Sequence, residues 1–173
     1  MALHMKWRLL PILLLLSSPV YANNFSYNYF EFRMGSSPQS LGAEYSLALT
    51  DNFHAVAHLD SQFDHDGDLA AGIGFNGPVN DFIDIYGQAL AHYVDYPKNR
   101  NEGSEALLEL NVGLKLWIAE NLETEVRVGT IDDHSIFNAG VRFHSTDQLS
   151  VGAGFVNNGI WGPQLELNVR AIF

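Results

Sequence analysis

The sequence has no cysteine among its 173 residues, which excludes disulfides, thiolate metal sites and a thiol nucleophile. Basic residues are also few, because nine Lys and Arg stand against 20 Asp and Glu and the formal net charge is −11. Nucleic acid is bound by clustered Lys and Arg, so this balance argues against a nucleic-acid partner. Long apolar runs are missing after residue 22, so no membrane-spanning helix is expected there.

The first 22 residues are predicted to be a cleaved signal peptide. A positively charged start precedes an apolar run at 9–16, and Val20 and Ala22 are the small residues that a signal peptidase accepts. The run is too short to cross a bilayer, which takes roughly 20 residues as a helix. We therefore expect a signal peptide at 1–22 and a single exported domain at 23–173.

Apolar and polar residues alternate one by one along most of the chain. In LLELNVGLKLW at 107–117, Glu109, Asn111, Gly113 and Lys115 share one parity, and the other parity is apolar throughout, with Leu108, Leu110, Val112, Leu114 and Leu116. Successive side chains of a strand point to opposite faces, so this segment is predicted to be an amphipathic strand. The same rule predicts ten strands, near 26–34, 41–50, 53–60, 69–76, 82–93, 106–118, 122–130, 136–144, 149–156 and 163–173.

The connections between the predicted strands are of two kinds. Tight turns rich in Gly, Asn and Asp are expected at 50–52, 76–81, 119–121 and 145–148. Longer or more polar connections are expected at 35–40, 60–68, 94–105, 131–135 and 157–162. Their alternation is typical of a meander of hairpins. We therefore predict an all-β, antiparallel up-and-down barrel of ten strands, or of eight if two of the shorter segments are loops.

Alternation alone does not tell whether the apolar face lines a core or meets lipid. The polar face mixes glycines with ion-pairing residues, which suits the crowded inside of a narrow barrel. The charged residues expected to line the lumen are Glu31, Arg33, Glu44, Asp84, Glu109, Lys115, Glu123, Glu125, Arg127, Arg142, Glu166 and Arg170. The other face is almost free of charge, and a charge at the lipid midplane costs roughly 2–4 kcal/mol.

Aromatic residues of the apolar face gather near the predicted strand ends, as in the girdles of membrane barrels. They are Phe53, Phe75, Phe143 and Phe173 beside the tight turns, and Tyr93, Phe137 and Phe155 toward the loops. Lipid also forbids unpaired backbone groups, so such a sheet must close on itself. These features favour a transmembrane barrel, with a soluble secreted barrel as the alternative.

Several stretches resemble known outer-membrane proteins. PQLELNVRAIF at 163–173 resembles the C-terminal strand of Gram-negative outer-membrane proteins, whose terminal aromatic, here Phe173, is read by the barrel-assembly machinery. That resemblance implies an outer-membrane location, with lipid and lipopolysaccharide as partners. FDHDGDLAAGIGFNGPV at 63–79, GLKLW at 113–117 and FNAGVRF at 137–143 resemble the small YfaZ-like outer-membrane proteins, which implies a porin-like barrel.

Two loops and a set of histidines are candidates for chemistry. Asp64, Asp66 and Asp68 alternate as in a calcium loop, although Phe75 stands where the bidentate acidic ligand is expected. A cation-binding loop is therefore an alternative to a solvated hairpin tip. The histidines expected on the inner face are His54, His58, His92 and His144, which could bind a transition metal or sense pH, with pairing to carboxylates as the simpler expectation.

In the connection at 131–135, Asp132 and His134 have the Asp-x-His spacing of the omptin proteases. A carboxylate that orients a His is also the arrangement of hydrolases in general. The omptins are much larger, so a solvated rim loop is the preferred interpretation. We assign no catalytic residue, no cofactor and no enzymatic activity.

The predicted lumen carries seven acidic and five basic residues. Eight strands leave room for side chains alone, whereas sixteen leave an aqueous channel, and ten lie near the filled end. We therefore expect a plugged or very narrow lumen with a mild preference for cations. The predicted function is that of a porin-like or structural barrel. A surface binding or adhesion barrel that acts through acidic loops is the alternative, and a rim-sited hydrolase is less favoured.

Overall fold

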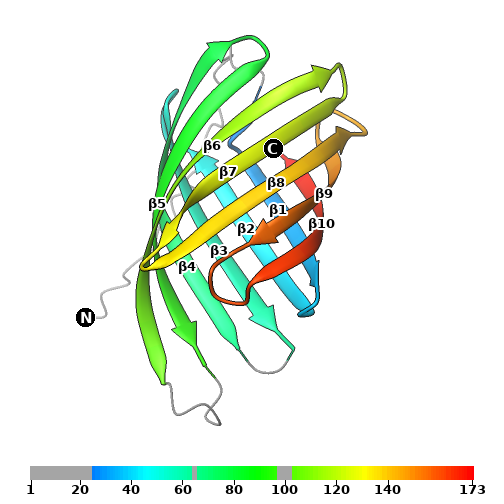
Figure 1. Ribbon diagram of the computed structural model, residues 1–173. Helices are drawn as coiled ribbons and strands as arrows, with labels where there is room; N and C mark the ends of the chain where they lie inside the picture. The colour runs from blue at the N-terminus through cyan, green and yellow to red at the C-terminus, as the bar shows by residue number, and fades with distance from the viewer. Residues whose placement is uncertain (1–24, 64–65, 97–102) are drawn as a thin grey trace, which may run out of the picture.

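The computed structural model describes residues 25–63, 66–96 and 103–173. Ten antiparallel strands form one sheet, and β10 pairs with β1, so the sheet closes into a barrel (Figure 1). The strands are β1 (Tyr29–Ser36), β2 (Ser40–Ala48), β3 (Phe53–Gln62), β4 (Gly67–Asn80), β5 (Ile83–Asp95), β6 (Ser104–Ala119), β7 (Leu122–Ile131), β8 (His134–His144), β9 (Leu149–Asn157) and β10 (Pro163–Ile172). The prediction of a ten-stranded up-and-down barrel is confirmed, and the eight-stranded alternative is wrong. The predicted signal peptide at 1–22 lies outside the described residues.

Each strand pairs with its neighbours in sequence, so the connections lie at two opposite ends of the barrel. The turn end, as we call it, holds the connections at 49–52, 81–82, 120–121 and 145–148. The loop end holds the connections that follow β1, β3, β5, β7 and β9. In Figure 1 the red β10 lies beside the blue β1, where the first and last strands close the wall. No described helix is long and apolar enough to cross a membrane.

Several connections are shorter than predicted, because the strands on either side are longer. The turn expected at 76–81 shrinks to 81–82, because β4 continues through Pro78 to Asn80. Proline is tolerated there because the pairing of β4 with β3 has already ended and the pairing with β5 is irregular.

The connection expected at 131–135 is also shorter than predicted. Ile131 pairs directly with His134, which leaves a two-residue turn. Asp132 has a φ of 45°, in the left-handed region that aspartate tolerates better than most residues. That conformation makes so tight a turn possible at a point where the acidic composition suggested an open loop.

The apolar side chains of the wall point outward. Leu110 and Leu167 are 53% and 59% exposed, whereas Glu109, the neighbour of Leu110 in β6, is 6% exposed. A soluble barrel would bury the leucines and solvate the glutamate. A barrel with an apolar exterior, a charged interior and no open sheet edge is a transmembrane barrel.

The aromatic residues predicted for the strand ends are exposed on this outer face. They are Phe53, Phe75, Phe143 and Phe173 toward the turn end and Tyr93, Phe137 and Phe155 toward the loop end. Neighbouring strands bring some of them together, and the ring centroids of Phe53 and Phe75 are 5.7 Å apart. Rings at both ends of the wall suit the two interfaces of a bilayer.

Glycines on the inner face make room for large polar side chains. The ring of Tyr86 lies against Gly113 on the next strand, where an added Cβ would overlap the ring. The imidazole of His54 lies against Gly74 in the same way. A narrow barrel can therefore hold rings and charged groups together in its interior.

Candidate functional site

The charged residues predicted for the lumen all lie on the inner face, buried or half-buried. Those exposed by less than a tenth are Glu31, Glu44, Asp84, Glu109, Lys115, Glu123, Arg142 and Arg170. Those half-buried are Arg33, Glu125, Arg127 and Glu166. They come from β1, β2, β5, β6, β7, β8 and β10, so charge is spread around the interior.

Glu31 is the centre of one group of ion pairs. Arg142 Nη2 and Arg170 Nε donate to Glu31 Oε2 at 2.7 and 2.8 Å. The guanidinium carbon of Arg170 also lies 3.8 Å from the centroid of the Tyr29 ring. These contacts link β1 to β8 and β10 through the interior, because two guanidinium groups share a single carboxylate.

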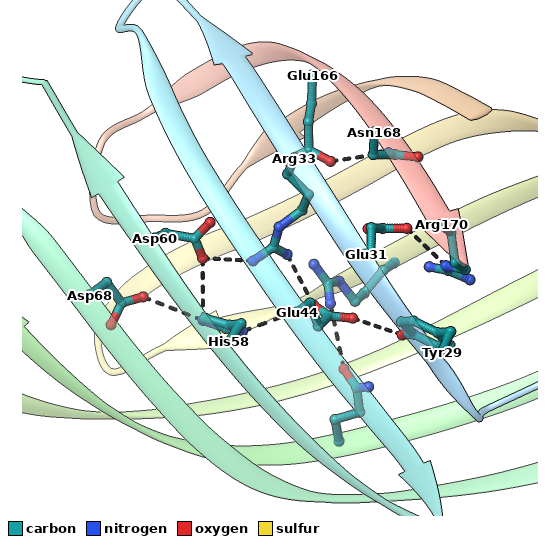
Figure 2. A network of polar contacts seen from close by, with 12 residues as sticks. Tyr29, Glu31, Arg33, Glu44, His58, Asp60, Asp68, Glu166, Asn168 and Arg170 are labelled. Carbon is teal, nitrogen blue, oxygen red and sulfur yellow. Dashed lines mark hydrogen bonds and ion pairs between the residues drawn. The ribbon is translucent and has the colours of Figure 1, made fainter. Parts of the chain in front are cut away.

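Arg33 is the centre of a second group, drawn in Figure 2. Its Nη1 donates to Glu44 Oε2 at 2.9 Å and its Nη2 donates to Asp60 Oδ2 at 2.6 Å. The Tyr29 hydroxyl donates to the other oxygen of Glu44 at 2.7 Å. Each carboxylate near Arg33 thus has a charged or hydroxyl donor, as buried carboxylates require.

The loop end of the lumen carries two histidines between carboxylates. His92 Nδ1 lies 2.9 Å from Asp68 Oδ2, and His92 Nε2 lies 3.0 Å from Glu109 Oε2. His58 Nε2 lies 3.4 Å from the same oxygen of Asp68 (Figure 2). The predicted pairing of lumen histidines with carboxylates therefore describes this end well.

The acidic segment at 64–68 is divided by the structure. Asp68 belongs to β4 and faces the lumen, where its partners are the two histidines. Asp66 is buried just before the strand, and its backbone carbonyl accepts a hydrogen bond from the Gln62 amide at 2.9 Å. Asp64 lies outside the described residues, so a cation site in the hairpin loop stays a prediction.

The turn end of the lumen is crossed by the segment at 25–28, which precedes β1. The phenyl ring of Phe25 stacks on Trp117 with centroids 5.7 Å apart, and Tyr27 stacks on His54 at 4.4 Å. Phe25 and Tyr27 are each 5% exposed. The alternation had predicted a strand from residue 26, and the structure instead places 25–28 inside the barrel as a plug.

Tyr27 connects this plug to the wall. Its hydroxyl donates to Asp84 Oδ2 at 2.7 Å, and Lys115 Nζ lies 4.2 Å from its ring centroid. The Ser46 hydroxyl donates to the Tyr27 carbonyl at 2.7 Å. Burial, with the nearby Asp84 carboxylate as the next cause, raises the pKa of Tyr27 far above its ordinary value of 10.0. The phenol is therefore neutral and acts as a donor.

Three cavities follow one another along the lumen. The central one has a volume of about 40 Å³, the loop-end one about 50 Å³ and the turn-end one about 390 Å³. The central and loop-end cavities share Arg33, Arg127, Asn138 and Glu166 as lining residues. The central and turn-end cavities share Lys115, Glu123 and Arg170. Shared lining residues mean that the cavities adjoin, and the central and loop-end cavities are much smaller than the turn-end one.

Several polar atoms in this interior have no protein partner among the described residues. Arg142 Nη1 and Asn168 Oδ1 are examples, and both residues line the central cavity. Buried polar groups are nearly always hydrogen-bonded, to water where no protein group is available. The interior therefore has places that water satisfies.

The turn that carries Asp132 and His134 is open to solvent. The Asp132 carboxylate accepts a hydrogen bond from the Leu108 amide at 2.9 Å, which extends the pairing of β6 with β7 by a side chain. Asp133 and His134 are exposed. The Asp132 carboxylate is thus used to shape the sheet, and none of the three lumen cavities is lined by Asp132, Asp133 or His134.

Several residues of the lumen were not predicted from the sequence, among them Tyr29, Tyr86, Gln88 and Asp60. The sequence did contain a signal for three of them, because residues two apart on a strand share a face. Tyr29 lies two residues from Glu31, and Tyr86 and Gln88 lie two and four residues from Asp84. Charge alone was too narrow a criterion. Tyrosine and glutamine satisfy carboxylates and guanidinium groups as well as ions do, as the hydrogen bond from Tyr86 to Glu125 illustrates.

No family model matches this chain, and no curated protein matches it. Solved structures that resemble it include porins and a designed transmembrane barrel. The NanC porin is 6% identical with a TM-score of 0.49, and the match covers 84% of this chain and 98% of that one. The KdgM porin is 8% identical with a TM-score of 0.48, with the same coverage. A de novo designed transmembrane β-barrel is 12% identical with a TM-score of 0.42 and covers 86% of this chain and 98% of its own. At such identities and scores, no function transfers from these proteins to this chain.

Proposed function

We propose that this protein is a small outer-membrane barrel whose lumen is a narrow conduit for water and small cations. The observation that carries the proposal is the run of adjoining polar cavities from the turn end to the loop end. A barrel with a purely structural interior would have ion pairs packed without such a run of cavities.

The size of the cavities limits what could pass. A cavity needs roughly 10–15 Å³ of volume open to a water-sized sphere to hold one water molecule, so the central and loop-end cavities, at about 40 and 50 Å³, match a few waters each. A sugar or an amino acid does not fit through such a constriction without rearrangement of the ion pairs. The turn-end cavity is wide enough to act as a vestibule.

The charge of the lining favours cations. Carboxylates outnumber arginines and lysine among the predicted lumen residues, and Asp60 and Asp68 add to that excess. Rings of acidic side chains select cations in membrane channels. Glu166 is well placed to contribute, because it lines both the central and the loop-end cavity.

The outer face supports the proposed location. An apolar wall with aromatic rings near both ends suits a Gram-negative outer membrane, where lipid and lipopolysaccharide would be its surroundings. Recognition of the last strand by the barrel-assembly machinery belongs to the same proposal. Directly after β10 the exposed ring of Phe173 stacks on Tyr45 with centroids 5.6 Å apart.

Single-channel recording of the full-length chain in planar bilayers tests conduction. We expect small, resolved current steps with cations preferred over anions. Glu166→Gln is expected to lower the cation preference at least twofold. The hydrogen bond that Glu166 accepts from Asn168 Nδ2, at 3.3 Å, is one that glutamine can still accept, so the fold should be kept.

Asp133→Asn is the matched control, because it removes a carboxylate from an exposed turn away from the cavities. Its selectivity should equal that of the wild type. Each protein is first shown to be a folded barrel by heat-modifiable migration on a gel. Folded protein that gives no current steps would overturn the conduit and leave a structural barrel.

A further inference from the structure

His58, Asp68 and His92 form a cluster with the composition of a metal site. Each offers one ligand atom, and these atoms all lie within 4.8 Å of one another. Two imidazoles and one carboxylate are a ligand set that zinc and other divalent transition metals use in proteins. We propose that these three residues bind a divalent transition-metal ion, with Zn²⁺ as the representative case, at the loop end of the lumen.

The distances between the donors suit such an ion. Asp68 Oδ2 lies 3.4 Å from His58 Nε2 and 2.9 Å from His92 Nδ1. In a tetrahedral zinc site with bonds of about 2.0–2.1 Å, neighbouring donor atoms are about 3.3 Å apart. The carboxylate oxygen is therefore already at nearly the right separation from both imidazoles, and only a small movement of the rings would admit the ion.

A second carboxylate orients one of the ligands. Glu109 Oε2 lies 3.0 Å from His92 Nε2, so this nitrogen carries a hydrogen toward Glu109 and Nδ1 faces Asp68. Glu109 is in turn held by a hydrogen bond from the Asn111 amide. Metal-binding histidines almost always donate their other ring N–H to a carboxylate, carbonyl or water. Binding would replace the hydrogen shared between His92 Nδ1 and Asp68 and release it as a proton.

The cluster stands on a rigid and accessible part of the barrel. Its ligands come from β3, β4 and β5, and Glu109 from β6, four consecutive strands of one closed sheet. All four residues line the loop-end cavity, which provides an entry path. Sites on strands hold their geometry better than sites on loops.

The fourth position of the ion is left to water. Asp60 Oδ2 lies 3.7 Å from His58 Nε2, but Arg33 Nη2 already donates to that oxygen at 2.6 Å. Three protein ligands with one open position suit an exchangeable ion. The proposal is independent of conduction, because a barrel without a conduit would still hold these residues together.

Calorimetric titration of the folded full-length protein with zinc chloride tests the site, after the protein has been treated with a chelator. We expect one ion per barrel and release of a proton, seen as a dependence of the heat on the buffer. His92→Gln and His58→Gln should each weaken binding at least 100-fold. Glu109→Gln, which alters only the orienting carboxylate, should weaken it 10- to 100-fold.

His144→Gln is the matched control. His144 is also a lumen histidine paired with a carboxylate, 2.9 Å from Glu123 Oε2, but it lies at the turn end. Its variant should bind zinc as the wild type does. Absence of heat with the wild type, or equal binding by the folded His58→Gln variant, would overturn the proposal. His58 is the less buried of the two histidines, so its variant keeps the test decisive if His92→Gln does not fold.

Discussion

The two ends of the lumen are built in different ways. At the loop end, charged and imidazole side chains of the wall itself face one another, with His92 between Asp68 and Glu109. At the turn end, the plug formed by residues 25–28 lies across the opening and brings Phe25 against Trp117. The same alternating strands therefore support one end that depends on charge and another that depends on aromatic packing.

This difference predicts how each end responds to change. Removal of a charged side chain at the loop end leaves its partners buried and unpaired, so we expect the free energy of unfolding of the barrel to fall. Removal of an aromatic ring at the turn end loosens the plug, which is not part of the sheet. We therefore expect both a lower free energy of unfolding and a less tightly blocked lumen. Substitutions at the two ends separate these effects.

Arg33→Ala is expected to have the largest effect. It leaves the buried carboxylate of Glu44 and the half-buried carboxylate of Asp60 without their guanidinium partner, and breaking a buried pair in this way costs about 3–5 kcal/mol. Unfolding by urea in lipid vesicles measures the loss. Arg33→Lys keeps the charge but loses the fork that reaches both carboxylates, so it should recover only part of the stability. An Arg33→Ala barrel as stable as the wild type would show that the stability of the loop end does not depend on ion pairs.

Phe25→Ala is expected to have the next largest effect. The buried ring stacks on Trp117, and truncation of a buried aromatic residue costs about 3 kcal/mol or more. The plug should also loosen, so the single-channel current should rise. Phe30→Ala is the control, because Phe30 is 47% exposed on the outer face and its removal does not touch the lumen. A current that stays the same in folded Phe25→Ala would show that the plug does not limit passage.

Tyr27→Phe is expected to have the smallest effect. It removes the hydrogen bond to Asp84 and should cost about 1.5 kcal/mol at neutral pH. Because folding raises the pKa of Tyr27 above its ordinary value of 10.0, its contribution is fully present below pH 10 and falls as the pH rises further. The free energy of unfolding of the wild type should therefore decline more steeply between pH 10 and 11.5 than that of Tyr27→Phe. Tyr45→Phe, on the outer face, should keep the slope of the wild type.

Strand number, pairing order and the direction of each face could be predicted from the sequence. Alternation in β6 is enough to place Leu110 and Glu109 on opposite faces, because side chains of a strand change face at every residue, and the glycines and ion-pairing residues of the polar face then indicate that Glu109 is inside. The turn at 132–133 could not be predicted from composition. Acidic residues occur in open loops as well as in tight turns, so composition does not distinguish the two. The left-handed conformation of Asp132 and the pairing of Ile131 with His134 are seen only in the structure.

The plug and the histidine cluster show where sequence reasoning stops. Phe25 and Tyr27 continue the parity of β1, so alternation extends the strand over a segment that leaves the wall. The sequence suggests that Asp68 acts with Asp64 and Asp66 in a loop, whereas its partners in the structure are His58 and His92 on adjacent strands. Contacts between residues on neighbouring strands depend on the pairing register, and the register depends on the exact length and type of each turn, which composition alone does not give.

The strand β9 makes room in the interior because glycines occupy inward positions on it. Its inward positions Gly152 and Gly154 stand where neighbouring strands carry long side chains. Arg142 of β8 can therefore extend past β9 and meet Glu31, next to Arg170. The contact between Glu31 and Arg170 depends on barrel closure, because the two residues are neighbours only when β1 pairs with β10. Pairing of β1 with β10 therefore adds the Arg170 ion pair to a buried carboxylate, so electrostatic attraction contributes to sealing the barrel.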